Sequence, residues 1–210
     1  MRRIPLLAIG LLALGTTPAQ AQLFNYPFTI MRSGVSATTV VAVFGRGLND
    51  ASGKQNLFGA TVARSGIGGR FSVRGGIGMI DATPDSELTF GGAVQARLND
   101  AASPTALTVL AGVGYMKPAT VTLTRFPIAV GLSRTFTQTS GTTITPSIVP
   151  RMEVGRLSAG GTSTTETDFG AAGALTLRLS SGLGFGVAVD VVASDPSAWL
   201  FGGNIQYSIQ

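Results

Sequence analysis

The chain has 210 residues, which allow one domain and leave little room for a second. Only 12% of the residues are charged, and the absence of cysteine and histidine excludes a disulfide framework, a cysteine-ligated metal and a histidine-based catalytic site. The formal net charge of +5 comes from arginines scattered singly, which does not indicate nucleic-acid binding.

The first 21 residues have the three parts of a secretory signal peptide. Arg2 and Arg3 form a basic start, residues 4–15 are largely apolar, and Ala19-Gln20-Ala21 is a cleavage pattern. Twelve apolar residues are too few to cross about 30 Å of hydrocarbon as a helix. We therefore expect residues 1–21 to be removed, residues 22–34 to form a periplasmic N-terminal segment, and residues 35–210 to form the folded domain.

Beyond Val35, turn-forming clusters recur every 12 to 18 residues and divide the chain into ten segments. No stretch of helical periodicity lies between them, so consecutive segments are expected to pair as antiparallel strands. The expected strands are residues 35–46, 55–64, 69–80, 87–98, 106–116, 124–136, 143–156, 167–180, 183–193 and 198–210.

Each clear segment has one bulky apolar side and one small or polar side. In residues 87–98, for example, Leu88, Phe90 and Val94 alternate with Thr89 and Gln95. The second side is too rich in Gly and Ala, and too poor in charge, for a water-facing surface. The pattern therefore predicts an all-β fold: a closed antiparallel up-and-down transmembrane β-barrel of about ten strands, with eight possible, whose bulky side faces lipid. The alternative is a secreted soluble β-barrel or sandwich that buries this side and binds a small apolar ligand.

Aromatic residues are expected in two girdles at the membrane interfaces. With the N-terminus in the periplasm, the outer girdle contains Phe90, Tyr115, Phe126, Phe169, Trp199 and Phe201, and the periplasmic girdle contains Phe71, Phe136, Phe185 and Tyr207. The same orientation predicts a short periplasmic turn at Ser180-Ser181-Gly182 and the longest outer loop around residues 157–167.

Residues 111–115 (Ala-Gly-Val-Gly-Tyr) and 125–132 (Arg-Phe-Pro-Ile-Ala-Val-Gly-Leu) resemble the central hairpin of small outer-membrane β-barrel proteins of Gram-negative bacteria. The resemblance implies an outer-membrane location, with outer-membrane lipid, lipopolysaccharide and the barrel-assembly machinery as partners. Such proteins usually end on an aromatic residue, whereas this chain ends Ile209-Gln210.

Charged residues expected on the inner side form a candidate lumen charge network: Arg70, Arg74, Arg97, Arg151, Glu153, Arg178 and Asp190. They are interpreted either as a buried salt-bridge network or as a pore constriction or ligand site. Glu166 and Asp168, in the expected loop, are either solvated or a divalent-cation site. No cofactor or resident metal is expected. Enzymes of this architecture resemble one another in using His, so we expect a non-enzymatic barrel that is structural or a narrow, anion-favouring porin-like channel.

Overall fold

The computed structural model describes residues 36–49, 55–81, 86–117, 121–193 and 197–209. The expected signal peptide (1–21) and N-terminal segment (22–34) lie outside the described residues. The strands are β1 (Ala37–Gly47), β2 (Asn56–Ile67), β3 (Phe71–Asp81), β4 (Glu87–Arg97), β5 (Thr105–Met116), β6 (Val121–Arg134), β7 (Phe136–Thr137), β8 (Thr143–Ala159), β9 (Thr162–Arg178), β10 (Leu183–Ala193) and β11 (Ala198–Ile209). Within this part of the chain, no helix is long and apolar enough to cross a membrane.

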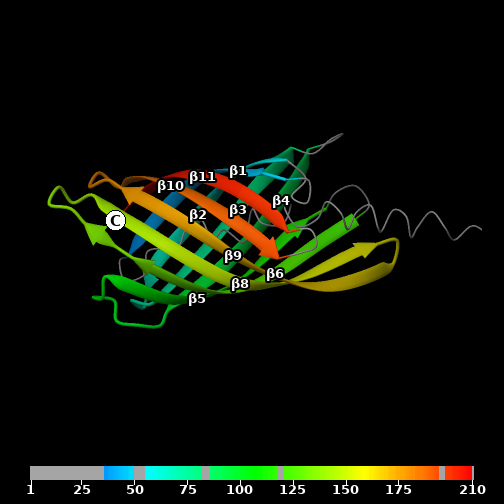
Figure 1. The fold of residues 1–210 in the computed structure, drawn as a ribbon, viewed down its shortest axis with the longest axis horizontal. Helices are drawn as coiled ribbons and strands as arrows, with labels where there is room; N and C mark the ends of the chain where they lie inside the picture. Colours follow the sequence, from blue (N-terminus) through cyan, green and yellow to red (C-terminus); the bar gives the residue numbers. More distant parts are fainter. Residues whose placement is uncertain (1–35, 50–54, 82–85, 118–120, 194–196, 210) are drawn as a thin grey trace, which may run out of the picture.

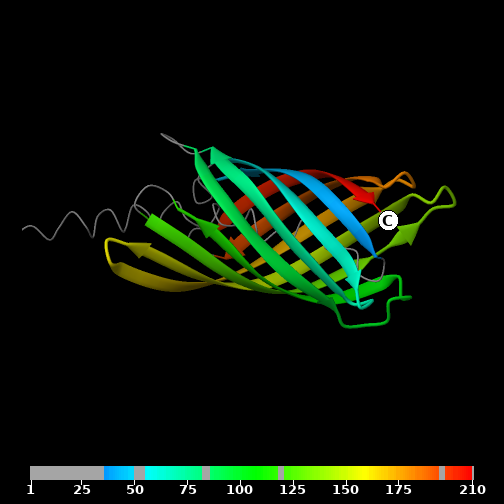
Figure 2. The same ribbon diagram turned by 180° about the vertical axis from the view of Figure 1, so that it is seen from behind.

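The strands form one closed antiparallel barrel (Figures 1 and 2). Each long strand pairs with its neighbour in the sequence, β1 pairs with β11, and β6 pairs with β8. The two-residue β7 continues the line of β6 along the edge of β8. β6 and β7 therefore count as one strand of the wall. The predicted ten-stranded up-and-down barrel is confirmed.

Closure has a direct physical reason. Unpaired backbone N–H and C=O groups cannot be hydrated in hydrocarbon, so a sheet that crosses a membrane must have no open edge. Val40 of β1 pairs with Val62 of β2 on one side and with Tyr207 of β11 on the other. The last strand thus satisfies the first, across the full length of the sequence.

The bulky apolar side chains of the strands point outward, as predicted. On β4, Leu88, Phe90 and Val94 are 58%, 47% and 54% exposed, whereas Thr89 and Gln95 are buried. The same alternation runs along β10 and β11, where Phe185, Val187 and Ile205 point outward. A soluble barrel or sandwich would have to bury this apolar side, so the soluble alternative is wrong for the described residues.

The prediction of a long outer loop around residues 157–167 is wrong. Instead, β8 continues to Ala159 and β9 starts at Thr162, and these two residues are the last cross-strand pair before the turn. Gly160 and Gly161 make the turn, with φ of 56° and 85°. A two-residue turn with both φ positive matches the twist of a hairpin, and glycine adopts it without strain. The Ser/Thr-rich run that suggested a loop is strand, because Thr is a good strand residue.

This long hairpin projects beyond the rest of the wall, at the end of the barrel opposite the C-terminus (Figures 1 and 2). We call that end the hairpin end and the other the terminal end. The expected turn at Ser180-Ser181-Gly182 is confirmed at the terminal end, where Leu179 N–H donates to the Leu183 carbonyl at 2.8 Å. The orientation expected from the sequence, with the N-terminus in the periplasm, places the hairpin end at the cell exterior, where outer-membrane barrels carry their longer hairpins.

The lumen at the hairpin end contains an apolar cluster. Leu157 of β8 and Ala174 of β9 pack against this cluster. Its buried members come from β1, β2, β3, β5, β6, β10 and β11, and they are Val41, Val43, Leu57, Ile80, Met116, Leu123, Ala188 and Leu200. Several are direct cross-strand partners, such as Leu57 with Ile80 and Met116 with Leu123. Apolar side chains therefore line the inside of this barrel as well as its outside.

Candidate functional site

Five charged side chains on the inner wall form a continuous ion network. Arg125 of β6 donates from Nη1 to Glu153 Oε2 at 3.1 Å and to Asp168 Oδ2 at 3.2 Å. Arg151 of β8 donates to the same Glu153 from Nε and to both carboxylate oxygens of Asp190, with Nη2 to Oδ2 at 2.8 Å. Glu153 thus joins two arginines, and the network ties together β6, β8, β9 and β10.

The network is almost fully withdrawn from solvent. The side chains of Arg151, Glu153 and Asp190 are each 1% exposed, and that of Arg125 is 3% exposed; Asp168, nearest the hairpin end, is 19% exposed. Charges in such a place are tolerated only when each is paired with good geometry. Arg151 meets this requirement with a bidentate salt bridge to Asp190, which suits the planar guanidinium.

Glycines on the intervening strands provide the routes for these arginines. Arg151 is paired in register with Gly170 of β9, and a Cβ built on Gly170 would lie 3.1 Å from Arg151 Cζ. Arg125 is likewise paired with Gly155 of β8, whose added Cβ would lie 3.8 Å from Arg125 Nε. Each guanidinium lies across a glycine and reaches an acid two strands away. These small inner residues make room for long neighbours lying flat on the wall.

The same arrangement recurs on the adjoining pair of strands, β10 and β11. Gln206 of β11 lies against Gly184 of β10, at 2.9 Å from an added Cβ, and Asn204 lies against Gly186. An inner face rich in Gly and Ala could leave space for water in the lumen. The structure shows that at least these glycines are covered by neighbouring side chains, so small residues alone are not evidence of a pore.

The residues predicted from the sequence have different positions in the structure. Arg151, Glu153 and Asp190 come together in the network. Arg74 and Arg97 are buried on the inner face, but Arg97 is bound by its own turn, through the carbonyls of Ser103 and Thr105 at 2.8 and 3.2 Å. Arg178 is half-buried at the terminal end of β9.

The prediction that Arg70 faces the lumen is wrong, because Arg70 is exposed and lies in the turn before β3. Gly68 and Gly69 have φ of 56° and 75°, and β3 begins only at Phe71. The alternation of sides does not extend back through a turn of this kind, so Arg70 does not face the lumen.

Arg125 and Asp168 belong to the network but were not predicted as members of it from the sequence. Arg125 was detectable, because Phe126 and Ile128 are clear outward residues and Arg125 must therefore point inward. Asp168, at the start of the expected strand 167–180, was grouped with Glu166 as a loop acid, and its facing was therefore not considered. It lies on β9, two residues before Gly170 and on the same inner side.

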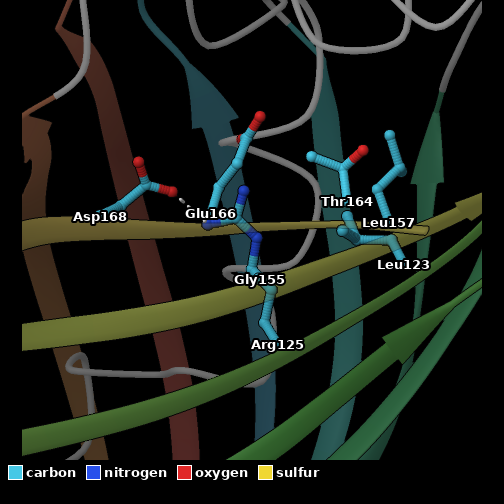
Figure 3. A pocket seen from close by; sticks show the side chains of 7 residues that line it. All are labelled: Leu123, Arg125, Gly155, Leu157, Thr164, Glu166 and Asp168. Carbon is cyan, nitrogen blue, oxygen red and sulfur yellow. Dashed lines mark hydrogen bonds and ion pairs between the residues drawn. The ribbon is translucent and has the colours of Figure 1, made fainter.

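A small pocket lies at the outer margin of the network, between β6, β8 and the projecting part of β9 (Figure 3). Leu123, Leu157 and Thr164 gather on one side of it, and Arg125, Glu166 and Asp168 on the other. Asp168, one of the two acids considered for a divalent cation, is engaged by Arg125. The exposed Glu166 is not paired with Arg125 in the described ion pairs.

Outside, the wall carries a continuous apolar belt with aromatic residues at its margins. All ten girdle aromatics expected from the sequence point outward; Phe90 stacks on Tyr115 with ring centroids 4.7 Å apart. Phe44 and Phe58, which were not predicted for the outer girdle, form a second pair at 5.4 Å. A closed barrel with an apolar outer surface and a charged, buried inner wall suits a membrane rather than water.

The chain has the fold of an outer-membrane β-barrel. Among solved structures it is similar to the β domain of the Bordetella autotransporter Brka, with a TM-score of 0.51 and 11% identity over 84% of this chain and 100% of that one. Also similar are the N-terminal barrel domain of Pseudomonas aeruginosa OprF (TM-score 0.39, 7% identity, 84% and 100% covered) and the outer membrane enzyme PagL (0.37, 14%, 82% and 99%).

No family model matches the chain, and no curated protein matches it. At 11% identity, the likeness to the Brka domain concerns the fold alone. The protein is thus an outer-membrane β-barrel by its architecture and lipid-facing surface, and its role must be argued from its own residues.

Proposed function

We propose that this outer-membrane barrel is a non-enzymatic structural protein whose lumen is closed to ions. The observation that carries the proposal is the burial of the inner wall: Ile80, Met116 and Leu200 of the apolar cluster and Glu153 and Asp190 of the ion network are each at most 2% exposed. Side chains that line a water-filled channel would be accessible to water. The apolar cluster and the ion network therefore both oppose ion passage.

The engagement of the acids supports the non-enzymatic part. A carboxylate that acts as a general acid, a general base or a nucleophile must be able to reach its substrate. Glu153 and Asp190 are held by Arg151, and Asp168 is held by Arg125. These three acids are thus engaged in joining strands of the wall.

A narrow anion channel is the second candidate, favoured by one observation inside the barrel. Among the described residues, the buried Thr61 Oγ1, Ser72 Oγ and both polar atoms of the Asn204 carboxamide have no hydrogen-bond partner. Buried polar groups without protein partners are usually satisfied by water. Water in this region, beside the buried Arg74 and Arg97, would form a vestibule attractive to anions.

Planar-bilayer recording separates the two. The mature protein, with folding verified by the gel mobility shift between boiled and unboiled samples, is expected to be silent. Discrete current steps from folded wild-type protein would contradict the closed-lumen proposal. Steps with anion preference, reduced when Arg97 and Arg178 are neutralised, would establish the channel.

A matched pair of variants sharpens this test. Leu123→Ser introduces a hydroxyl into the apolar cluster and is expected to produce flickering conductance by wetting it. Leu132→Ser, on the outward side of the same strand, is the control and is expected to remain silent. Equal conductance from both would indicate a general loss of integrity of the wall.

A further inference from the structure

The outward side of β6, β8 and β9 changes character above the aromatic belt. Phe126 and Val154 are outward cross-strand partners, as are Met152 and Phe169, and they form the upper edge of the apolar surface. From the row of Phe126 and Val154 towards the hairpin end, the other outward positions carry one arginine, Arg156, and six hydroxyl residues: Thr122, Thr124, Ser158, Ser163, Thr165 and Thr167.

Arg156 lies at the centre of this hydroxyl band. Its cross-strand partners are Thr124 on β6 and Thr165 on β9. Side chains directly opposite one another in an antiparallel sheet have Cβ atoms about 5 Å apart, so both hydroxyls flank the guanidinium stem. Arg156 is exposed, and the next row towards the hairpin end adds Ser158 with its partners Thr122 and Ser163.

The charges of the hairpin are divided between its two sides. Glu166 and Asp168 alternate with Thr165 and Thr167, and thus face the lumen side together with Arg125 and Glu153. The described outward positions of this surface include Arg156 and no acid. The surface is therefore complementary to an anion with many hydrogen-bonding groups, on top of an apolar wall.

We propose that the outward face centred on Arg156 binds the phosphorylated sugar headgroup of an outer-leaflet glycolipid, with the acyl chains lying on Phe126 and Phe169. Arg156 pairs with the phosphate, because a guanidinium offers several N–H donors to its oxygens. The hydroxyl band receives the sugar. This inference uses the outer-membrane placement of the barrel and does not depend on whether the lumen conducts.

The height of the hydroxyl band selects a sugar headgroup over an ordinary phospholipid. The seven steps from Phe169 to Thr162 cover about 23 Å of strand, or about 18 Å along the membrane normal at a tilt of about 40°. The headgroup layer of a phospholipid leaflet is only about 5–7 Å thick. A phosphorylated glycolipid has both the phosphate and the height to cover the band.

The test measures retention of purified lipid A by the full mature barrel in detergent, using native mass spectrometry. Phosphorylated lipid A is expected to remain bound, whereas dephosphorylated lipid A of the same acyl composition is expected to bind about tenfold more weakly, since a charge-assisted pair is lost. Phosphatidylglycerol in excess is not expected to displace the phosphorylated form. Displacement by phosphatidylglycerol would overturn the glycolipid assignment.

Variants locate the site. Arg156→Gln is expected to lower lipid A binding about tenfold and Arg156→Lys by less, because the lysine keeps the charge. Thr124→Val with Thr165→Val, which leaves the charge in place, is expected to weaken binding. The control is Arg134→Gln, which removes an exposed outward arginine from the terminal end of β6. Unchanged binding in Arg156→Gln, or equal loss in Arg134→Gln, would overturn the proposal.

Discussion

Arg151 donates to both carboxylate oxygens of Asp190, although strand β9 lies between the strands that carry them. A barrel wall normally joins only adjacent strands, through the backbone. Here a side chain adds a bond across three strands, and Gly170 is the residue that leaves its path free.

Gly170→Ala is therefore expected to destabilise the barrel by about 1–3 kcal/mol, the range for overpacking a well-packed site. The new Cβ would lie 2.7 Å from the Val191 carbonyl oxygen and 3.1 Å from Arg151. Denaturant titration of the protein folded in lipid vesicles measures the change. The control on the same strand is Gly173→Ala, where the added Cβ meets nothing within 4 Å. Equal stability of the two variants would contradict the crossing of Arg151 over Gly170.

Glu153→Gln is expected to cost about 3–5 kcal/mol, because it removes one partner of a buried ion network and leaves two arginines short of negative charge. The same vesicle titration applies. Glu166→Gln is the matched control on the exposed hairpin and is expected to change the free energy of unfolding by less than about 0.5 kcal/mol. A small effect at position 153 would show that the network does little for stability.

Gly173→Arg tests which side of the wall faces lipid. Gly173 is exposed in the middle of β9, so the new charge would meet hydrocarbon at a cost of about 2–4 kcal/mol. Gly173→Leu at the same position is expected to be tolerated. Position 174 has the opposite facing, but Ala174 packs against the apolar cluster, so crowding would also penalise arginine there. Equal stability of Gly173→Arg and wild type would reverse the side assignment.

The tip of the long hairpin provides a local test. Gly160→Asn is expected to be neutral, because asparagine is accepted at a positive φ in this kind of turn. Gly161→Val is expected to cost about 1–2 kcal/mol, because a β-branched residue fits a left-handed conformation poorly. Hydrogen exchange of Thr162–Thr167 should speed up in Gly161→Val alone. If both variants exchange alike, Gly161 does not require its positive φ.

The processing of the N-terminus stays a prediction from the sequence. Mass measurement of the exported protein is expected to show a chain that starts at Gln22. Retention of residues 1–21 on the mature protein would remove the signal-peptide interpretation.

Much of the fold was predictable from local patterns. The alternation of Leu88, Phe90 and Val94 with Thr89 and Gln95 determines which side of β4 faces outward, because side-chain direction in a strand repeats every two residues. Strand number followed from the turn clusters. Local patterns do not predict facing where alternation is interrupted, as at Arg70 in its glycine turn. They also gave a wrong loop in the Thr-rich part of β9, where composition suggested a loop and the residues alternate as a strand.

The sequence by itself determined that the protein is a β-barrel with its bulky side in lipid, because period-2 alternation and turn spacing are local properties. Only the tertiary structure decided the partners of Arg151 and Arg125. These depend on cross-strand register, which sets Arg151 beside Gly170 and Arg125 beside Gly155, and register depends on how ten strands close into one wall. The filling of the lumen was decided at the same level, because it results from side chains that meet only after closure.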